Sequence, residues 1–224
     1  MKKILFMLLL CTPLSYMGCK AEPEWVNLIA QQEQEKGQEE KREEADSEFK
    51  WANLADSCTT VLINQFMNKP KGTFWASPAN ESNNSGNIYW QQAHAMDVLI
   101  YSYQRIKDKN PNLADTYENY FKLWYANKAN NYDKGDTKYG TTGFGNRFTD
   151  DMCWISLTLI RLSEATGDDT YINMAKTLYD TQIITRAWED EKGKGLPWKE
   201  LSVDKARNAC TNSPGCLVAA KLYL

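Results

Sequence analysis

The chain has 224 residues, of which 42% are hydrophobic and 25% are charged, and its formal net charge at pH 7 is −3. No basic stripe or cluster interrupts this mildly acidic composition, which argues against a nucleic-acid partner. His94 is the only histidine, and no cysteine spacing resembles a zinc site, so the composition also argues against a metal centre.

Residues 1–19 have the features of an export signal. Two lysines precede the apolar stretch ILFMLLLCTPL, which is too short to cross a bilayer because a spanning helix needs about 20 apolar residues. The segment ends in YMGC, and a small residue before Cys19 resembles a bacterial lipobox, although Tyr16 stands where leucine is usual. We therefore expect an exported protein that is anchored to the membrane by a lipid on Cys19, in the periplasm or on the cell surface. An ordinary signal peptide cleaved nearby is the alternative.

Residues 20–46 are predicted to form a charged spacer. The run QQEQEKGQEEKREEAD at positions 31–46 holds no aromatic or β-branched residue and almost no apolar surface. Such a run cannot offset the entropy lost on ordering, so we expect a disordered, solvated spacer before a folded part that begins near residue 47. A frayed polar helix is the alternative.

From residue 47 onward the apolar pattern has a helical period, and no alternating strand pattern occurs. Helices are predicted over about 51–66, 90–103 and 113–128, from the start of the Asp150-Asp151 segment to Gly167, over 169–186, and from Ser213-Pro214 to the end of the chain. The fourth of these is apolar most of the way round, which indicates burial on most sides. The sequence therefore predicts an all-α fold in which some helices lie inside others. Long loops at 69–88 and 131–148 precede helix starts, where functional loops are common.

Two adjacent carboxylates, Asp150 and Asp151, begin the fourth helix. Adjacent Cα atoms lie roughly 3.8 Å apart and helical side chains diverge by about 100°, so the carboxyl separation of about 5 Å used by retaining glycosidases is within reach. Acids in a first helical turn also complement the helix dipole without any catalytic role. In the preceding loop, Gly143, Gly145 and Asn146 would let backbone amides approach an anion.

Several other residues suit contact with a sugar, which needs flat apolar faces and hydrogen-bonding groups. The candidates are Trp90, Gln91, Trp198 and Lys199. Trp90 could equally belong to the core and Lys199 could simply be solvated, whereas the glycine- and proline-containing loop around Trp198 favours a sugar platform. We interpret His94 as a structural residue that is hydrogen-bonded inside the fold.

The remaining polar and thiol side chains have structural interpretations. Asn208 and Asn212 are expected to cap turns, with substrate contact as the second interpretation. Cys58 and Cys153 lie in apolar helical patterns, which predicts buried thiols. Cys210 and Cys216 could form a disulfide in an exported protein, and the sequence leaves this open.

Four segments together resemble glycoside hydrolase family 76, namely YWQQAHAMD at 89–97, FTDDMCWISLTLIRLSEATGD at 148–168, GLPWK at 195–199 and ARNACTNSPGCLVAAKLY at 206–223. The resemblance covers about residues 50–224. It implies an (α/α)6 barrel, of which six helices would be roughly half, and endo-α-1,6-mannanase activity on α-mannan without metal or organic cofactor. It also implies that Asp150 is the nucleophile and Asp151 the general acid/base.

The leading hypothesis is a membrane-anchored, retaining mannanase that works by two-carboxylate double displacement. The alternative is a non-catalytic surface lipoprotein that binds glycans or proteins. A different (α/α)6 hydrolase acting on uronic-acid glycans would need basic residues converging on the cleft, and Arg147 is the obvious one beside the pair. The last helix is still running at Leu224, so we expect a longer coding region, and a half barrel could be inactive.

Overall fold

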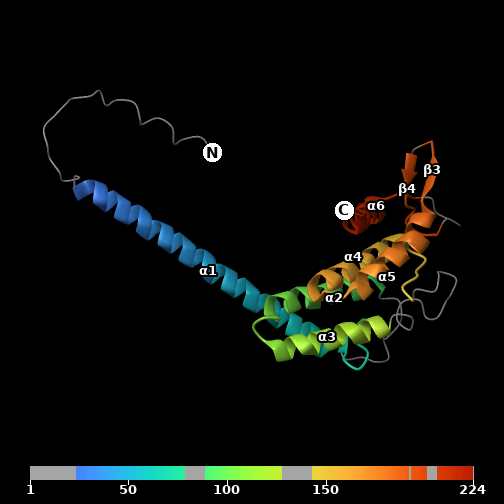
Figure 1. Cartoon of the computed structure of the whole chain (residues 1–224), viewed down its shortest axis with the longest axis horizontal. Helices are drawn as coiled ribbons and strands as arrows, with labels where there is room; N and C mark the ends of the chain where they lie inside the picture. The colour runs from blue at the N-terminus through green and yellow to red at the C-terminus, as the bar shows by residue number, and fades with distance from the viewer. Residues whose placement is uncertain (1–23, 79–88, 128–142, 192, 201–205, 224) are drawn as a thin grey trace. The chain divides into compact units, whose positions relative to one another are not determined.

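In the computed structural model, the described residues are 24–78, 89–127, 143–191, 193–200 and 206–223 (Figure 1). The predicted export signal, Cys19 and most of the two long loops lie outside these ranges. The chain divides into two units, Met1–Trp51 and Ala52–Leu224, and the first helix runs through the boundary. The described residues form six α-helices, which are α1 (Glu24–Phe66), α2 (Tyr89–Ile106), α3 (Pro111–Ala126), α4 (Thr149–Thr166), α5 (Asp169–Leu178) and α6 (Ala209–Tyr223).

The described part of the first unit is helical from Glu24 onward. This differs from the disordered spacer predicted over 20–46, because residues 24–46 belong to α1. Glutamate, glutamine, lysine and arginine are all good helix formers, so a helix can persist here without a core. Over residues 30–46 the side chains are nearly all exposed, as expected for a solvated segment. None of the described helices is both long enough and apolar enough to cross a membrane.

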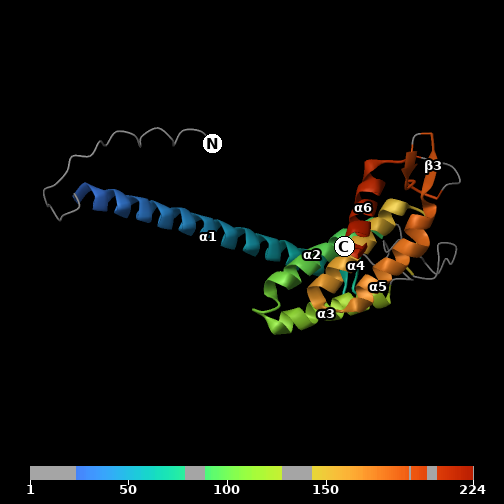
Figure 2. The same ribbon diagram turned by 45° about the horizontal axis from the view of Figure 1, so that its top comes forward.

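In the second unit, the helices alternate between two layers in chain order. Helix α4 packs against α2 on one side and α6 on the other, while α3 packs on α2 and α5 packs on α4 (Figure 2). Helices α2, α4 and α6 therefore form an inner layer, and α3 and α5 form an outer one. This position explains why α4 is buried nearly all the way round, as its apolar pattern predicted.

The helix ends follow local sequence signals. Gly167 adopts the left-handed conformation with φ 76° and donates its N–H to Ser163 O, which ends α4 as predicted. Pro111 begins α3 after the cap Asn110. The helical backbone predicted over 169–186 is present, with a π-helical segment at Tyr179–Ile183 and a 3-10 turn at Ile184–Arg186 after α5.

Helix α6 begins five residues earlier than predicted, at Ala209 rather than at Pro214. The predicted start was Ser213-Pro214, but Asn208 Oδ1 accepts a hydrogen bond from Thr211 N at 2.9 Å and caps a helix that starts at Ala209. Asparagine is among the strongest N-caps, so this earlier signal prevails. Pro214 lies inside the helix, where it cannot donate to the carbonyl of Cys210.

Two short antiparallel hairpins were not predicted. Strand β1 (Met67–Asn68) pairs with β2 (Thr73–Phe74), and β3 (Trp188–Asp190) pairs with β4 (Gly193–Gly195). Strands of two or three residues are too short to show an alternating pattern.

The cysteines only partly follow prediction. Cys153 is buried as expected, but Cys58 is exposed because it lies on the solvated side of α1. Cys210 and Cys216 are both free thiols.

Candidate active site

Asp150 and Asp151 lie in the first turn of α4 and are both buried, with 5% and 8% of their surface exposed. Their burial follows from the central place of α4 in the inner layer. The segment after β4 runs antiparallel to the chain that enters α4, since Thr149 N donates to Trp198 O at 2.8 Å and Glu200 N donates to Arg147 O at 2.9 Å. The fold thus brings the predicted GLPWK loop directly onto the acid pair.

Asp150 accepts hydrogen bonds from three parts of the chain. Its Oδ1 accepts from the backbone N of Asp151 at 3.0 Å. Its Oδ2 accepts from Trp198 Nε1 at 3.0 Å and from the thiol of Cys210 at 3.6 Å. Burial raises the pKa of Asp150 above its ordinary value, and these donors oppose that rise because they favour the charged carboxylate.

Asp151 has a different environment. None of the described residues donates a hydrogen bond to its carboxyl group, and burial followed by the charge of Asp150 raises its pKa to about 7. Near neutral pH the pair therefore favours one charged group, Asp150, and one protonated group, Asp151. This is the division that acid/base chemistry on adjacent carboxyls requires.

Arg186 holds the loop that enters α4. Its guanidinium donates to Asn146 O at 2.7 Å, to Arg147 O at 3.0 Å and to the Thr149 hydroxyl at 3.4 Å. The side chain of Asn146 accepts from Phe148 N at 2.8 Å, so its oxygen shapes this turn. Sequence reasoning missed Arg186, because nothing local distinguishes it from any basic residue at a helix end.

Trp198 has a second role besides the predicted sugar platform. Its indole N–H is committed to Asp150, and its ring packs on Phe148 with centroids 5.3 Å apart. Lys199 Nζ lies 5.4 Å from the same ring, so Lys199 is packed beside the site and half-buried. Trp198 therefore contacts the acid pair directly, and Lys199 lies beside Trp198.

At the start of α2, Trp90 is 44% exposed, which argues against a core role in the described part of the chain. Its ring contacts His94 and Trp154, with centroid distances of 5.7 and 6.2 Å. The prediction that His94 is enclosed is wrong for the described residues, because 49% of its side chain is exposed. Trp154, one helical turn after the acid pair, was missed because its spacing is that of a core residue. Gln91 is half-buried, and its Oε1 has no hydrogen-bond partner among the described residues.

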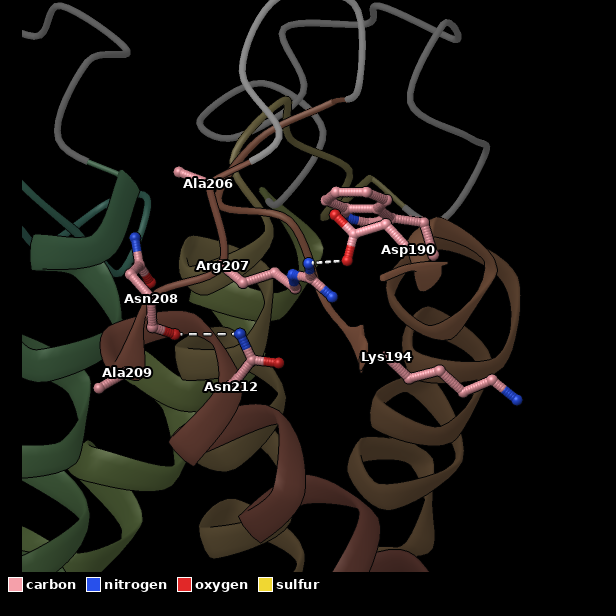
Figure 3. Close-up of a pocket in the computed structure, with 8 residues that line it drawn as sticks. Asp190, Lys194, Ala206, Arg207, Asn208, Ala209 and Asn212 are labelled. Carbon is pink, nitrogen blue, oxygen red and sulfur yellow. Dashed lines mark hydrogen bonds and ion pairs between the residues drawn. The ribbon is translucent and has the colours of Figure 1, made fainter. Parts of the chain in front are cut away.

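A cavity of about 790 Å³ lies beside the start of α6 (Figure 3). Arg207 stacks on Trp188 at 4.4 Å and is paired with Asp190, which neutralises its charge. Asn208 lines this cavity and also contacts Cys210. The acid pair does not line the cavity, which adjoins it through the first turn of α6. Within the described part of the chain, no group of three or more His, Cys, Asp or Glu side chains could hold a metal ion.

The comparisons with known proteins agree on one family. The profile of glycosyl hydrolase family 76 matches residues 50–224. The structure of the GH76A α-1,6-mannanase from Salegentibacter sp. HEL1_6 matches with 27% identity and a TM-score of 0.56, over 77% of this chain and 45% of that one. An inactive variant of that enzyme, with two consecutive aspartates replaced by asparagine and in complex with α-1,6-mannotriose, matches with 26% identity and a TM-score of 0.57 over the same shares.

The family 76 mannosidase from Bacteroides thetaiotaomicron VPI-5482 matches with 18% identity and a TM-score of 0.59, over 77% of this chain and 48% of that one, and so supports the fold alone. No curated protein sequence matches the chain.

The fold and the family profile place the chain among the helical-barrel glycoside hydrolases. The solved relatives have an (α/α)6 barrel, and the six helices described here form part of it, which confirms the predicted fold. The chain belongs to glycosyl hydrolase family 76. It spans less than half the length of these solved relatives.

Proposed function

We propose that the protein containing this chain is a retaining endo-α-1,6-mannanase, with Asp150 as nucleophile and Asp151 as general acid/base. The observation that carries this proposal is the unequal environment of two adjacent buried carboxyls. Asp150 has three hydrogen-bond donors, whereas Asp151 has none among the described residues and a pKa raised to about 7.

In the first step, the charged Asp150 attacks the anomeric carbon and forms a covalent sugar ester. Asp151 gives its proton to the glycosidic oxygen as the leaving sugar departs. In the second step, Asp151 takes a proton from water, and that water displaces Asp150 from the sugar. Two inversions at one carbon give net retention. A pKa near 7 suits this alternation, because neither the proton's release nor its recovery is then strongly unfavourable near neutral pH.

The solved relatives support both the chemistry and the substrate. The Salegentibacter enzyme is an α-1,6-mannanase. Its inactive variant, in which two consecutive aspartates are replaced by asparagine, forms a complex with α-1,6-mannotriose. We propose α-mannan as the substrate here on this basis. Trp90, with its exposed ring, and Gln91 on α2 would supply sugar contacts together with Trp198 and Lys199 in the loop after β4. Asn146 would shape the loop beside the reacting carbon.

The test compares Asp150→Asn and Asp151→Asn with wild type in the full-length protein. Each substitution is expected to lower release of oligosaccharides from α-1,6-mannan at least about a thousandfold, since each removes an essential step. With an activated aryl leaving group, Asp151→Asn should still form the ester, whereas Asp150→Asn should not. Proton NMR of the first product should show the α-anomer. Wild type that binds mannan but releases no sugar would instead support the non-catalytic alternative.

We also propose that Cys19 carries a lipid anchor, which would place the enzyme on a membrane facing the periplasm or the outside of the cell. The long exposed helical segment over 30–46 suits a spacer between such an anchor and the catalytic domain. Labelled palmitate should be incorporated into wild type and not into Cys19→Ala. Incorporation into that variant, or none into wild type, would contradict the anchor.

A further inference from the structure

The thiol of Cys210 lies between two oxygen acceptors that belong to different elements. Its Sγ is 3.6 Å from Asp150 Oδ2 on α4 and 3.1 Å from Asn208 Oδ1 before α6. A thiol has a single hydrogen, so it can donate to only one of these oxygens at a time. From its sequence position alone, this cysteine could be half of a disulfide with Cys216, but both thiols are free, and Cys210 takes no part in the two steps of the proposed hydrolysis.

The position of this thiol is fixed by the packing of α6 against the loop that holds Trp198. The side chain of Asn212 donates to Leu196 O at 3.0 Å and accepts from Leu196 N at 2.9 Å. A Cβ added at Gly215 would lie 2.6 Å from Leu196 Cδ1, so α6 approaches this loop as closely as glycine permits. The loop in turn binds the start of α4 through Trp198 O. These contacts hold Cys210 against the nucleophile.

The chemistry of the thiol suits a donor rather than a reactive nucleophile. Desolvation by the surrounding chain, followed by the charge of Asp150, raises the pKa of Cys210 even though the residue is exposed, so the group keeps its hydrogen at neutral pH. A thiol is a weak donor that can rotate about the Cβ–Sγ bond. It can therefore respond to a change in charge on Asp150 without moving the backbone.

We propose that Cys210 is a positioning residue for the nucleophile, an inference that rests on the proposed function. Its thiol donates to Asp150 Oδ2 while that carboxylate is charged, and it turns to Asn208 Oδ1 when Asp150 becomes a neutral sugar ester. No proton leaves the sulfur in either step. The thiol thereby stabilises the ionised nucleophile and releases it as the ester forms.

The first test is the pH dependence of kcat/KM for Cys210→Ala, Cys210→Ser and the control Cys216→Ala in the full-length protein. Cys216 is a free, exposed thiol on the same helix that does not contact Asp150. The ionisable groups around Asp150 are Asp151 and Cys153 on α4, Cys210, and Arg186, which reaches Thr149.

Removing the donor raises the pKa of Asp150, so Cys210→Ala should move the acidic limb upward by roughly half a pH unit. Cys210→Ser keeps a donor and should not move the limb upward, and Cys216→Ala should match wild type. KM should be little changed. Equal shifts in the alanine and serine variants, no shift in either, or the same shift in Cys216→Ala would overturn the proposal.

A second test does not depend on hydrolysis, and it separates this proposal from the function itself. The rate of iodoacetamide labelling at Cys210 and Cys216 is measured by peptide mass spectrometry at pH 8 in wild type and Asp150→Asn. Loss of the carboxylate charge should lower the pKa of Cys210 and speed its labelling roughly three- to tenfold. Labelling of Cys216 should stay the same. An unchanged ratio of the two rates would refute the contact, even if mannan is hydrolysed. A changed ratio would support the contact, even if wild type released no sugar.

Discussion

Replacing Asp151 with asparagine is expected to stabilise the fold at neutral pH while it abolishes hydrolysis. Burial and the charge of Asp150 raise the pKa of Asp151 from 3.8 to about 7. The folded state therefore holds this proton over a pH range in which the unfolded state has lost it. Stability contributed by the protonated group is fully present below about pH 4 and is lost as the pH rises toward 7.

The magnitude follows from the size of that shift. About three pKa units at 1.36 kcal/mol each correspond to roughly 4 kcal/mol. Asparagine carries no charge at any pH. The difference in the free energy of unfolding between Asp151→Asn and wild type should therefore grow in favour of the variant by up to about 4 kcal/mol between pH 4 and pH 8.

Urea unfolding of both proteins at a series of pH values measures this difference. Asp180→Asn is a matched control of opposite sign. Asp180 is an exposed carboxyl whose pKa is lowered by its hydrogen bonds from Lys176 and Tyr223, so any stability it contributes is lost as the pH falls. A difference for Asp151→Asn that does not change with pH would refute the claim that its burial is costly.

Three further substitutions probe the site and its scaffold. Trp198→Phe keeps the ring and removes the donor to Asp150 Oδ2, so the acidic limb of the kcat/KM profile should rise by about one pH unit, and an unmoved limb would contradict this role. Arg186→Met should lower kcat at least about tenfold, because the loop carbonyls before α4 lose their hydrogen-bond donor. Arg186→Lys keeps a donor and should be partly active. Full activity of the methionine variant would show that the loop keeps its conformation without Arg186. Gly72→Ala should destabilise the fold by more than about 2 kcal/mol in urea unfolding, because Gly72 has φ 66° and its added Cβ would lie 2.5 Å from Tyr120 O. The control Gly167→Ala, at a glycine with φ 76° and open space around it, should destabilise the fold by only about 1 kcal/mol. Equal losses of stability in the two variants would contradict the clash at Gly72.

Local sequence signals were sufficient to predict a structural feature wherever that feature is stabilised by residues close together in the sequence. Pro111 and Gly167 mark helix ends through their own backbone preferences, and the almost fully apolar α4 had to be an inner helix. Such signals failed where two of them compete, as at α6, where Asn208 prevailed over Ser213-Pro214. Local signals favoured a disordered spacer over residues 24–46, where the structure has a helix. A solvated helix lacks the apolar stripe from which a helix is recognised in a sequence.

By itself, the sequence determined that the chain is helical and that Asp150 and Asp151 stand together at a helix start, and it singled out the GLPWK loop as a candidate for sugar contact. Only the tertiary structure decided how the two acids differ. The donors that favour a charged Asp150 come from Trp198 and Cys210, which lie 48 and 60 residues away along the chain. A pKa depends on burial and on groups within a few ångströms, and no local pattern encodes which distant side chains folding will bring there.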